Sequence, residues 1–506
     1  MINALMLMPL AAGLLAFLIR GDAARRTLLL WTARVHFLLA VFVIGKSIVG
    51  NPFSPLIAAV VQAPVREPAA LWFAYDPLGL LFLGITSLLF LGASQYAVTY
   101  LALEKRDPGE EAADGFIFNN APEAVFTGCL LLFLAAMTAV TASRHMGLLW
   151  ASVEATTLLS APLIYFHRHK RSLEATWKYL LICSVGIALA LMGNLFLGAA
   201  GIKAGAGLDI GGLLAQAASL DKPLLKAAFL FLFVGYGTKM GLSPFHTWLP
   251  DAHSEAPAVV SALLSGALLN CAFLGVLRVN AVCARAGLAD FTGGILMLFG
   301  LFSMVTAALF MLGQRDYKRL LAYSSIEHMG ILALGVGLGG AGIFGAMLGA
   351  LSHSLAKAGL FFTSGVVLAA EKTKRIADVK GLWRRAPKTA ALWLGGFFII
   401  TGTPPSGVFL AKFLILKEAL ALKHYWLAGA YLFFLAILFA GMANVFISMT
   451  FGERAEKPGE KSFVEPGGML VPAAFFFACV MLAGLYMPGW LNELINRAAQ
   501  GVAGKL

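Results

Sequence analysis

The sequence has few charged residues for its length. Charged side chains make up 13% of the 506 residues, whereas hydrophobic side chains make up 59%. Soluble domains normally carry about 25% charged residues. This shortage of charge excludes an ordinary soluble protein, because most of the chain must face lipid or other apolar helices. We therefore predict an all-α integral membrane protein.

Motifs for metals and redox centres are also lacking. The chain has five cysteines, and no two of them form a C-x-x-C pair. This argues against iron–sulfur clusters, zinc and c-type haem on this chain. His246 and His253, with Asp251 and Glu255 nearby, do not have the spacing of a standard metal site. We expect no cofactor and no bound metal.

Acidic residues are fewer than basic ones, and the formal net charge is +12. No basic stripe with interleaved aromatic residues occurs on a polar segment, so we expect no nucleic-acid partner. Instead, lysine and arginine gather in alternate loops between apolar runs, for example at 168–171, 315–319 and 372–385. Basic residues collect in cytoplasmic loops. The bias predicts a multi-pass protein of the lipid bilayer with its N-terminus outside.

Long apolar runs are what the sequence has in abundance. A spanning helix needs about 20 apolar residues, and by this criterion there are about 14 spans. The seventh and twelfth spans are interrupted by glycine and proline. The expected spans are 2–19, 27–49, 79–101, 124–142, 146–166, 177–200, 223–248, 257–281, 290–312, 319–338, 342–369, 388–421, 427–451 and 468–488.

The two interrupted spans lie five spans apart, as two copies of a five-helix unit would place them. Because each unit has an odd number of spans, the second copy is inverted in the membrane. We therefore predict discontinuous helices 7 and 12 within two inverted repeats. The predicted units are 1–120 (helices 1–3), 121–285 (helices 4–8), 286–452 (helices 9–13) and 453–506 (helix 14).

Three ionisable residues lie inside apolar runs. Glu154 lies in Met146–Tyr165, Lys239 just before Pro244, and Lys412 after the break at 404–405. A charge near the bilayer centre costs about 2.5–3.5 kcal/mol. Ionisable residues at that depth therefore usually have a function, most often the movement of ions or protons. Burial favours neutral lysine and a nearby carboxylate favours the charged form. A change in the Glu154–Lys239 separation would thus switch the lysine between its charged and neutral forms. A helix-terminus hydrogen bond for Glu154 and a snorkelling Lys239 are the structural alternatives.

Further histidines and lysines extend this set. Histidine titrates near neutral pH and can relay protons. His353 and Lys357 are four residues apart and share one helical face. Lys178 lies near the start of a span, where snorkelling is an equal alternative. The predicted proton-transfer line consists of Glu154, Lys178, Lys239, His253, His328, His353, Lys357 and Lys412.

Three segments carry a family resemblance. They are H-T-W-L-P-D-A-H-S-E-A-P at 246–257, D-Y-K-R-L-L-A-Y-S-S at 316–325 and S-H-S-L-A-K-A at 352–358. They resemble the antiporter-like membrane subunits of respiratory complex I, the Mrp antiporters and the group 4 membrane-bound hydrogenases. The stretches that begin at Glu154 and Ser172 look most like the F component of hydrogenase-4.

The resemblance implies 14 helices with inverted repeats, a coupled Glu154–Lys239 pair, Lys357 as the central relay and Lys412 as the terminal lysine. It also implies a non-catalytic, proton-translocating subunit of a redox complex, of the hydrogenase-4, formate hydrogenlyase or complex I type. Its partners would be other membrane subunits and a peripheral redox arm, in a bacterial or archaeal plasma membrane. Two alternatives remain open: a cation/proton antiporter without redox partners, moving protons or Na⁺, and a scaffold that does not pump.

Overall fold

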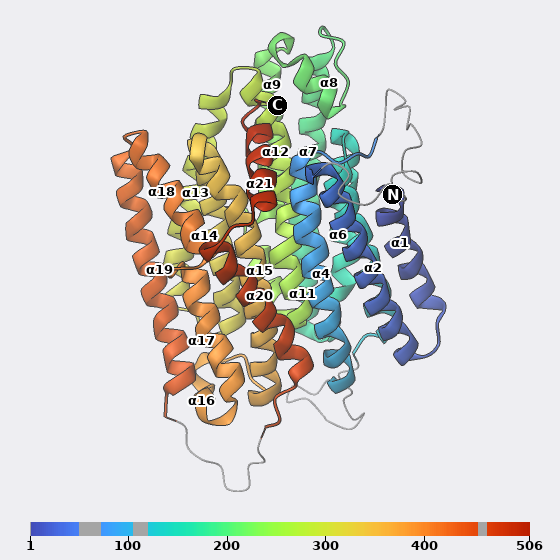
Figure 1. The fold of residues 1–506 in the computed structure, drawn as a ribbon, viewed down its shortest axis with the longest axis vertical. Helices are drawn as coiled ribbons and strands as arrows, with labels where there is room; N and C mark the ends of the chain where they lie inside the picture. The colour runs from blue at the N-terminus through green and yellow to red at the C-terminus, as the bar shows by residue number, and fades with distance from the viewer. Residues whose placement is uncertain (1, 50–71, 105–119, 454–462, 506) are drawn as a thin grey trace.

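The computed structural model describes residues 2–49, 72–104, 120–453 and 463–505. Within these ranges the regular secondary structure is helical, apart from three isolated β-bridges. The predicted all-α architecture is confirmed. Figure 1 shows the helices packed side by side as one elongated bundle.

Eleven described helices are long and apolar enough to cross a membrane. This finding confirms an integral membrane protein, whereas the total of about 14 spans stays a prediction. The eleven are α2 (Asp22–Val49), α4 (Pro77–Leu103), α5 (Glu123–Ala142), α6 (Met146–Ile164), α7 (Lys170–Gly201), the continuous helix α11–η2–α12 (Ala258–Arg285), α13 (Ala289–Met311), α14 (Tyr317–Leu338), α15 (Gly340–Glu371), α19 (Tyr425–Phe451) and α20 (Gly467–Leu485). Helix α1 (Ile2–Leu18) is apolar but shorter.

Both predicted interruptions are present. The first separates α9 (Lys222–Met240) from α10 (Trp248–Glu255), and the second separates α17 (Pro387–Thr401) from α18 (Gly407–Ala421). Each break begins with a glycine in the left-handed region, Gly241 at φ 79° and Gly402 at φ 88°. Glycine takes this conformation without the steric cost of a Cβ, so it ends a helix readily.

The two interrupted helices run in opposite directions. Helix α9 begins at the upper end of the bundle in Figure 1, whereas α17 begins near the lower end, beside α16 (Leu382–Arg385). Opposite directions are what an inverted repeat requires. The boundaries of the two five-helix units stay a prediction.

The lower end of the bundle in Figure 1 carries many basic residues, and we call it the basic end. It comprises the connections 19–21, 165–169, 312–316 and 372–386. Their lysines and arginines are Arg20, Arg168, Arg315, Lys372, Lys374, Arg375, Lys380, Arg384 and Arg385.

The helix that follows the last predicted span was not foreseen. Helix α21 (Gly489–Val502) follows α20 and buries Leu494, Ile495, Ala498 and Val502 on one face. These positions recur at intervals of one, three and four residues, which is the pattern of an amphipathic helix. A criterion based on continuous apolar runs misses such a helix. The remaining short elements are α8 (Ile210–Ala215), η1 (Ala217–Ser219), the π-helical turn η2 (Leu264–Leu268) between α11 (Ala258–Leu263) and α12 (Leu269–Arg285), and η3 (Ile376–Asp378).

Helices α7 and α9 approach each other closely at glycines. A Cβ placed on Gly235 of α9 would lie 2.5 Å from the carbonyl oxygen of Gly186 in α7. Small residues let membrane helices pack backbone to backbone. This contact holds the part of α9 that ends at Lys239 against α7.

The close approach yields a test of packing. We expect Gly235→Ala to lower the free energy of unfolding by about 1–3 kcal/mol, because the added methyl group has no room. Gly237→Ala, two residues along the same helix, is the control, since its Cβ would meet Leu242 at an ordinary 3.6 Å. Thermal unfolding in detergent, followed by exposure of the buried cysteines to a thiol dye, measures both. Equal stability of the two variants would contradict the tight contact.

Candidate functional site: a chain of buried ionisable residues

Lys239 and Glu154 are connected through a hydroxyl group. Lys239 lies in the last turn of α9 and is fully buried. Its Nζ donates to the Thr157 hydroxyl and, at 3.2 Å, to the Tyr179 hydroxyl. The Thr157 hydroxyl in turn donates to Glu154 Oε2 at 3.0 Å, and Ser184 donates to Oε1 at 3.0 Å. The two predicted partners therefore meet across Thr157.

This arrangement can carry a proton in either direction. A hydroxyl both accepts and donates a hydrogen bond, so Thr157 can take a proton from Lys239 while passing its own to Glu154. One proton leaves the ammonium group, one arrives at the carboxylate, and the hydroxyl is unchanged. The pair thus has a charged state and a neutral state, and both keep their hydrogen bonds.

Lys412 forms the second buried ion pair. It lies in α18 just after the second break, and its Nζ is 3.1 Å from Glu327 Oε1 of α14. The carbonyl oxygens of Ile400 and Thr401, at the end of α17, lie 3.4 and 3.3 Å from the same Nζ. The break frees these carbonyls from helical hydrogen bonds. Carboxylate and carbonyls together supply the partners that a buried ammonium group needs.

Two stacked imidazoles lie between the breaks in sequence. The rings of His328 and His353 have centroids 4.9 Å apart. The two ring nitrogens of His328 lie 2.8 Å from the Ser324 carbonyl oxygen and 3.1 Å from that of Ile400. A neutral imidazole has one N–H and can donate to one of them, whereas the protonated ring can donate to both. The backbone thus provides a place for an added proton.

Lys357 shares a helical face with His353, as the four-residue spacing predicts. It is fully buried, and its Nζ donates to the Leu321 carbonyl oxygen at 2.6 Å. His253 of α10 is also fully buried and stacks on Phe361 at 5.0 Å. Neither ring nitrogen of His253 has a hydrogen-bond partner among the described residues.

Lys178 lies apart from these buried residues. Its side chain is 45% exposed and pairs with Glu174 at 2.7 Å and Asp251 at 3.0 Å. Arg319 also contacts Asp251, at 2.5 Å. The structure thus places Lys178 in an ion-pair cluster near the solvent. Its long chain reaches outward, as in the snorkelling alternative.

The predicted line omitted several residues that the structure brings into contact with it. Glu327 directly precedes His328 in an apolar span, so its position carried a signal. Thr157 lies three residues after Glu154, a helical neighbour spacing that also indicated contact. Lys318 belongs to a basic loop cluster in the sequence, yet it is buried and donates to the carbonyl oxygens of Ser254 and Ala256 at 3.1 and 2.5 Å. Nothing in its local sequence indicates this burial.

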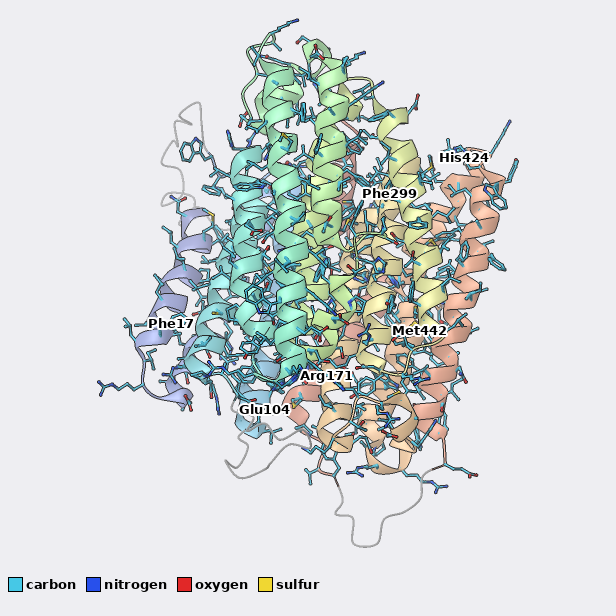
Figure 2. The ribbon with its side chains drawn as sticks, turned by 180° about the vertical axis from the view of Figure 1, so that it is seen from behind. Phe17, Glu104, Arg171, Phe299, His424 and Met442 are labelled. Atoms are coloured by element: carbon cyan, nitrogen blue, oxygen red, sulfur yellow. The ribbon has the colours of Figure 1, made fainter. Side chains whose placement is uncertain are left out.

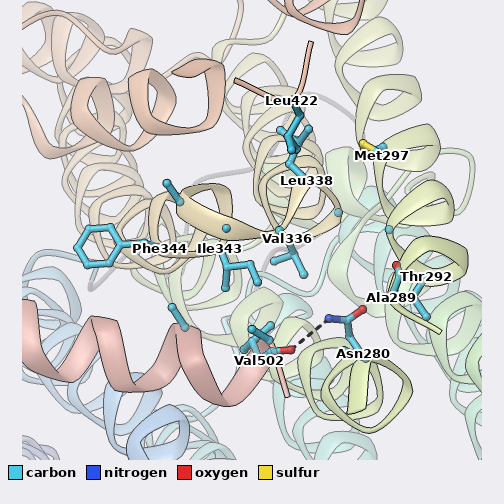
Figure 3. Close-up of a pocket in the computed structure, with 18 of the residues that line it drawn as sticks. Asn280, Ala289, Thr292, Met297, Val336, Leu338, Ile343, Phe344, Leu422 and Val502 are labelled. Atoms are coloured by element: carbon cyan, nitrogen blue, oxygen red, sulfur yellow. Dashed lines mark hydrogen bonds between the residues drawn. The ribbon is translucent and has the colours of Figure 1, made fainter. Parts of the chain in front are cut away.

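A cavity of about 780 Å³ lies at the end opposite the basic end, between α12, α13, α14, α15 and α21 (Figure 3). Asn280 of α12 donates to the Val502 carbonyl oxygen of α21 across it, at 3.5 Å. None of the eight residues of the predicted proton-transfer line is among its described lining residues. The cavity is separate from the buried ionisable chain.

A helical membrane bundle with two interrupted helices, and with buried carboxylates, lysines and histidines beside the breaks, defines a class of ion-translocating membrane proteins. The family described as NADH:quinone oxidoreductase/Mrp antiporter, transmembrane, matches residues 143–439. The chain belongs to this family. The resemblance inferred from the three sequence segments is confirmed.

Individual relatives agree with this assignment. The chain is 35% identical over 428 residues to the hydrogenase-4 component F homolog of Methylacidiphilum infernorum (isolate V4), which covers 84% of this chain and 87% of the relative. It is 31% identical to hydrogenase-4 component B of Escherichia coli (strain K12), covering 86% of this chain and 65% of the relative.

Solved structures show the same fold. A chain of the Mrp complex from Dietzia sp. DQ12-45-1b superposes with a TM-score of 0.82 at 19% identity, covering 99% of this chain and 97% of that chain. A chain of respiratory complex I from Thermus thermophilus with bound NADH superposes with a TM-score of 0.79 at 24% identity, covering 99% and 100%.

The Lys412–Glu327 ion pair can be tested by its contribution to the free energy of unfolding. Lys412→Met leaves Glu327 buried without its cation, so we expect a loss of about 3–5 kcal/mol in the free energy of unfolding. Adding Glu327→Gln removes the uncompensated charge and should recover part of the loss. Lys417→Met, at an exposed position of the same helix, should change stability by less than about 0.5 kcal/mol. Unfolding in mixed detergent micelles measures the three variants, and a double variant no better than Lys412→Met alone would contradict the pairing.

Proposed function

We propose that this chain is a proton-translocating, non-catalytic subunit of a membrane-bound redox complex of the hydrogenase-4 or complex I type. The observation that carries the proposal is the connection of Glu154 to the buried Lys239 through Thr157, at the end of an interrupted helix. The relation to hydrogenase-4 components and to the NADH:quinone oxidoreductase family supports the redox context.

The switching step takes place at the first break. Moving the end of α9 away from α6 lengthens the Lys239–Thr157 contact, which weakens the stabilisation of the ammonium group by the carboxylate. Burial then favours the neutral lysine, so Lys239 releases its proton. When Glu154 approaches again, the charged lysine is restored by taking up another proton. Each cycle moves one proton past this position.

The proton released by Lys239 then passes to Lys357 and on to Lys412. His353 and His328 stack beside Lys357, and protonation of His328 gives each of its two facing carbonyls a donor. The Ile400 carbonyl oxygen is shared by His328 and Lys412, which links this histidine to the second break. In this proposal Glu327 stabilises the charged form of Lys412 as Glu154 stabilises that of Lys239.

Partners and orientation follow from the same proposal. The relatives are components of multi-subunit membrane complexes, so other membrane subunits are expected around this chain, with a peripheral redox arm to supply the energy. We place the protein in the plasma membrane, with its N-terminus outside and the basic end toward the cytoplasm, because lysine and arginine collect there. We assign the repeats to 121–285 and 286–452, with protons as the transported ion.

Replacement of Lys239 or of its bridge tests the proposal. We expect Lys239→Met to abolish proton translocation by the intact complex in liposomes, measured with a pH-sensitive dye. Thr157→Val removes the bridging hydroxyl, and because a hydrogen bond to a charged group is worth about 1.5–3 kcal/mol, the rate should fall at least about tenfold. Electron transfer by the partner subunits serves as the measure of assembly.

Thr156→Val is the matched control. The Thr156 hydroxyl donates within its own helix, to the Val153 carbonyl oxygen at 2.6 Å, and contacts neither Glu154 nor Lys239. Its rate should stay near that of the unmodified protein. Full proton translocation in the assembled Lys239→Met complex would refute the proposed role. Copurified subunits that lack redox centres would instead identify an antiporter complex.

A further inference from the structure

Two histidines outside the proton-transfer line lie side by side at the basic end. His167 and His169 belong to the connection between α6 and α7, and their rings are nearly parallel, 6° apart, with centroids 6.4 Å apart. Figure 2 labels Glu104 and Arg171 at this end of the bundle. Imidazoles exchange protons with water near neutral pH, so their place on this surface matters for a protein that takes up protons.

Each histidine approaches a carboxylate from a different helix. His167 Nδ1 is 3.6 Å from Glu104 Oε1 at the end of α4, and His169 Nε2 is 3.4 Å from Glu255 Oε2 at the end of α10. The His167 and Glu104 side chains are 21% and 24% exposed, His169 is 23% exposed, and Glu255 is 11% exposed. The cluster thus reaches from solvent to a mostly buried carboxylate.

The hydrogen bonds of His169 set the direction of transfer. Its Nδ1 accepts the Ser172 amide N–H at 3.0 Å and so caps the start of α7. The neutral ring therefore carries its proton on Nε2, toward Glu255. A proton that binds Nδ1 displaces the amide contact and lets Nε2 release its own proton to the Glu255 carboxylate. One proton enters the ring and one leaves it.

Glu255 connects this surface to the interior. Its Oε1 lies 2.9 Å from Lys374 Nζ and 3.3 Å from the Ser254 hydroxyl. His253, two residues before Glu255 in the same helix, is fully buried and has two ring nitrogens without partners among the described residues. Polar contacts thus lead from the solvent to Glu255, which lies two residues from His253, a member of the predicted line, in the same helix.

Other ionisable groups surround the two imidazoles. The Tyr100 hydroxyl lies 3.4 Å from His167 Nε2. Arg171 and Asp251 line a depression of about 200 Å³ with Glu255. The titratable and charged groups around the two imidazoles and Glu255 are Tyr100 and Glu104 at the end of α4, Arg171, Glu174 and Lys178 of α7, Asp251 of α10, Lys318 and Arg319 of α14, and Lys374.

We propose that His167, His169, Glu104 and Glu255 form a proton-collecting site, which takes protons from the solution at the basic end and passes them through Glu255 toward His253. The inference rests on the proposed proton-translocating function and adds the surface groups that supply it. A collecting site matters when protons are scarce, because the rate at which a buried group is loaded then depends on how many surface groups hold protons for it.

His169→Asn is the main test variant. Asparagine also caps helices well, so α7 keeps its first turn while the titratable ring is lost. We expect proton translocation near the unmodified rate at acidic pH. Toward alkaline pH, direct uptake from solution becomes limiting, and the rate should fall by up to about tenfold per pH unit. Glu255→Gln should give the same pH profile. The measurement is dye-detected proton uptake by the intact complex in liposomes.

Imidazole buffer distinguishes proton supply from structure. It should restore the alkaline rate of His169→Asn. His145→Asn is the matched control, because His145 also caps a helix through Nδ1, accepting the Gly147 amide at 3.2 Å, at the opposite end of the bundle. It should leave the pH profile unchanged.

The outcomes separate this site from the function on which it rests. An unchanged pH profile in His169→Asn, or a loss that is equal at every pH and not restored by imidazole, overturns the collecting site. If Lys239→Met is inactive in the same preparations, the proposed function still stands. If Lys239→Met pumps normally, the proposed function fails, whatever the histidine variants do.

Discussion

Every buried cation in this protein must have a polar partner inside a medium that cannot solvate it. A single unpaired charge removed from water costs several kcal/mol, and a membrane interior offers no water to compensate. Lys239 meets two hydroxyls, Lys357 a backbone carbonyl, and Lys412 a carboxylate and two carbonyls. The rest of the architecture can be understood as the means of supplying these partners.

The interrupted helices follow from this constraint. A continuous helix already uses its carbonyl groups in internal hydrogen bonds, whereas the carbonyls at a helix end have no internal partner and are free to face a lysine. Ending α17 at Thr401 frees the carbonyls that face Lys412, and Gly402 makes the sharp change of direction without steric cost. Helix α9 ends directly after Lys239 in the same way. The second break therefore supplies backbone carbonyls to Lys412, whereas the partners of Lys239 at the first break are side-chain hydroxyls.

The same partners also make the charges movable. Thr157 contacts both Glu154 and Lys239, so neutral and ionised states of the pair retain hydrogen bonds. Solved relatives at 19–24% identity share the overall fold, which shows that helix packing tolerates wide change in sequence. The overall helix packing alone does not move a proton. The proposed function depends on a small set of contacts between polar groups on different helices.

Hydropathy and composition were sufficient for the membrane class, both helix breaks, the half-buried Glu154 and the buried Lys239, Lys357 and Lys412. Insertion into lipid depends on local apolar content, and breaks depend on glycine and proline. The bridge through Thr157, the burial of Lys318 and the outward position of Lys178 could not be read in this way. They depend on how each helix is rotated about its axis and which neighbour it meets. Those angles arise from packing between distant segments, such as the glycine contact of α7 with α9, and local sequence patterns do not contain them.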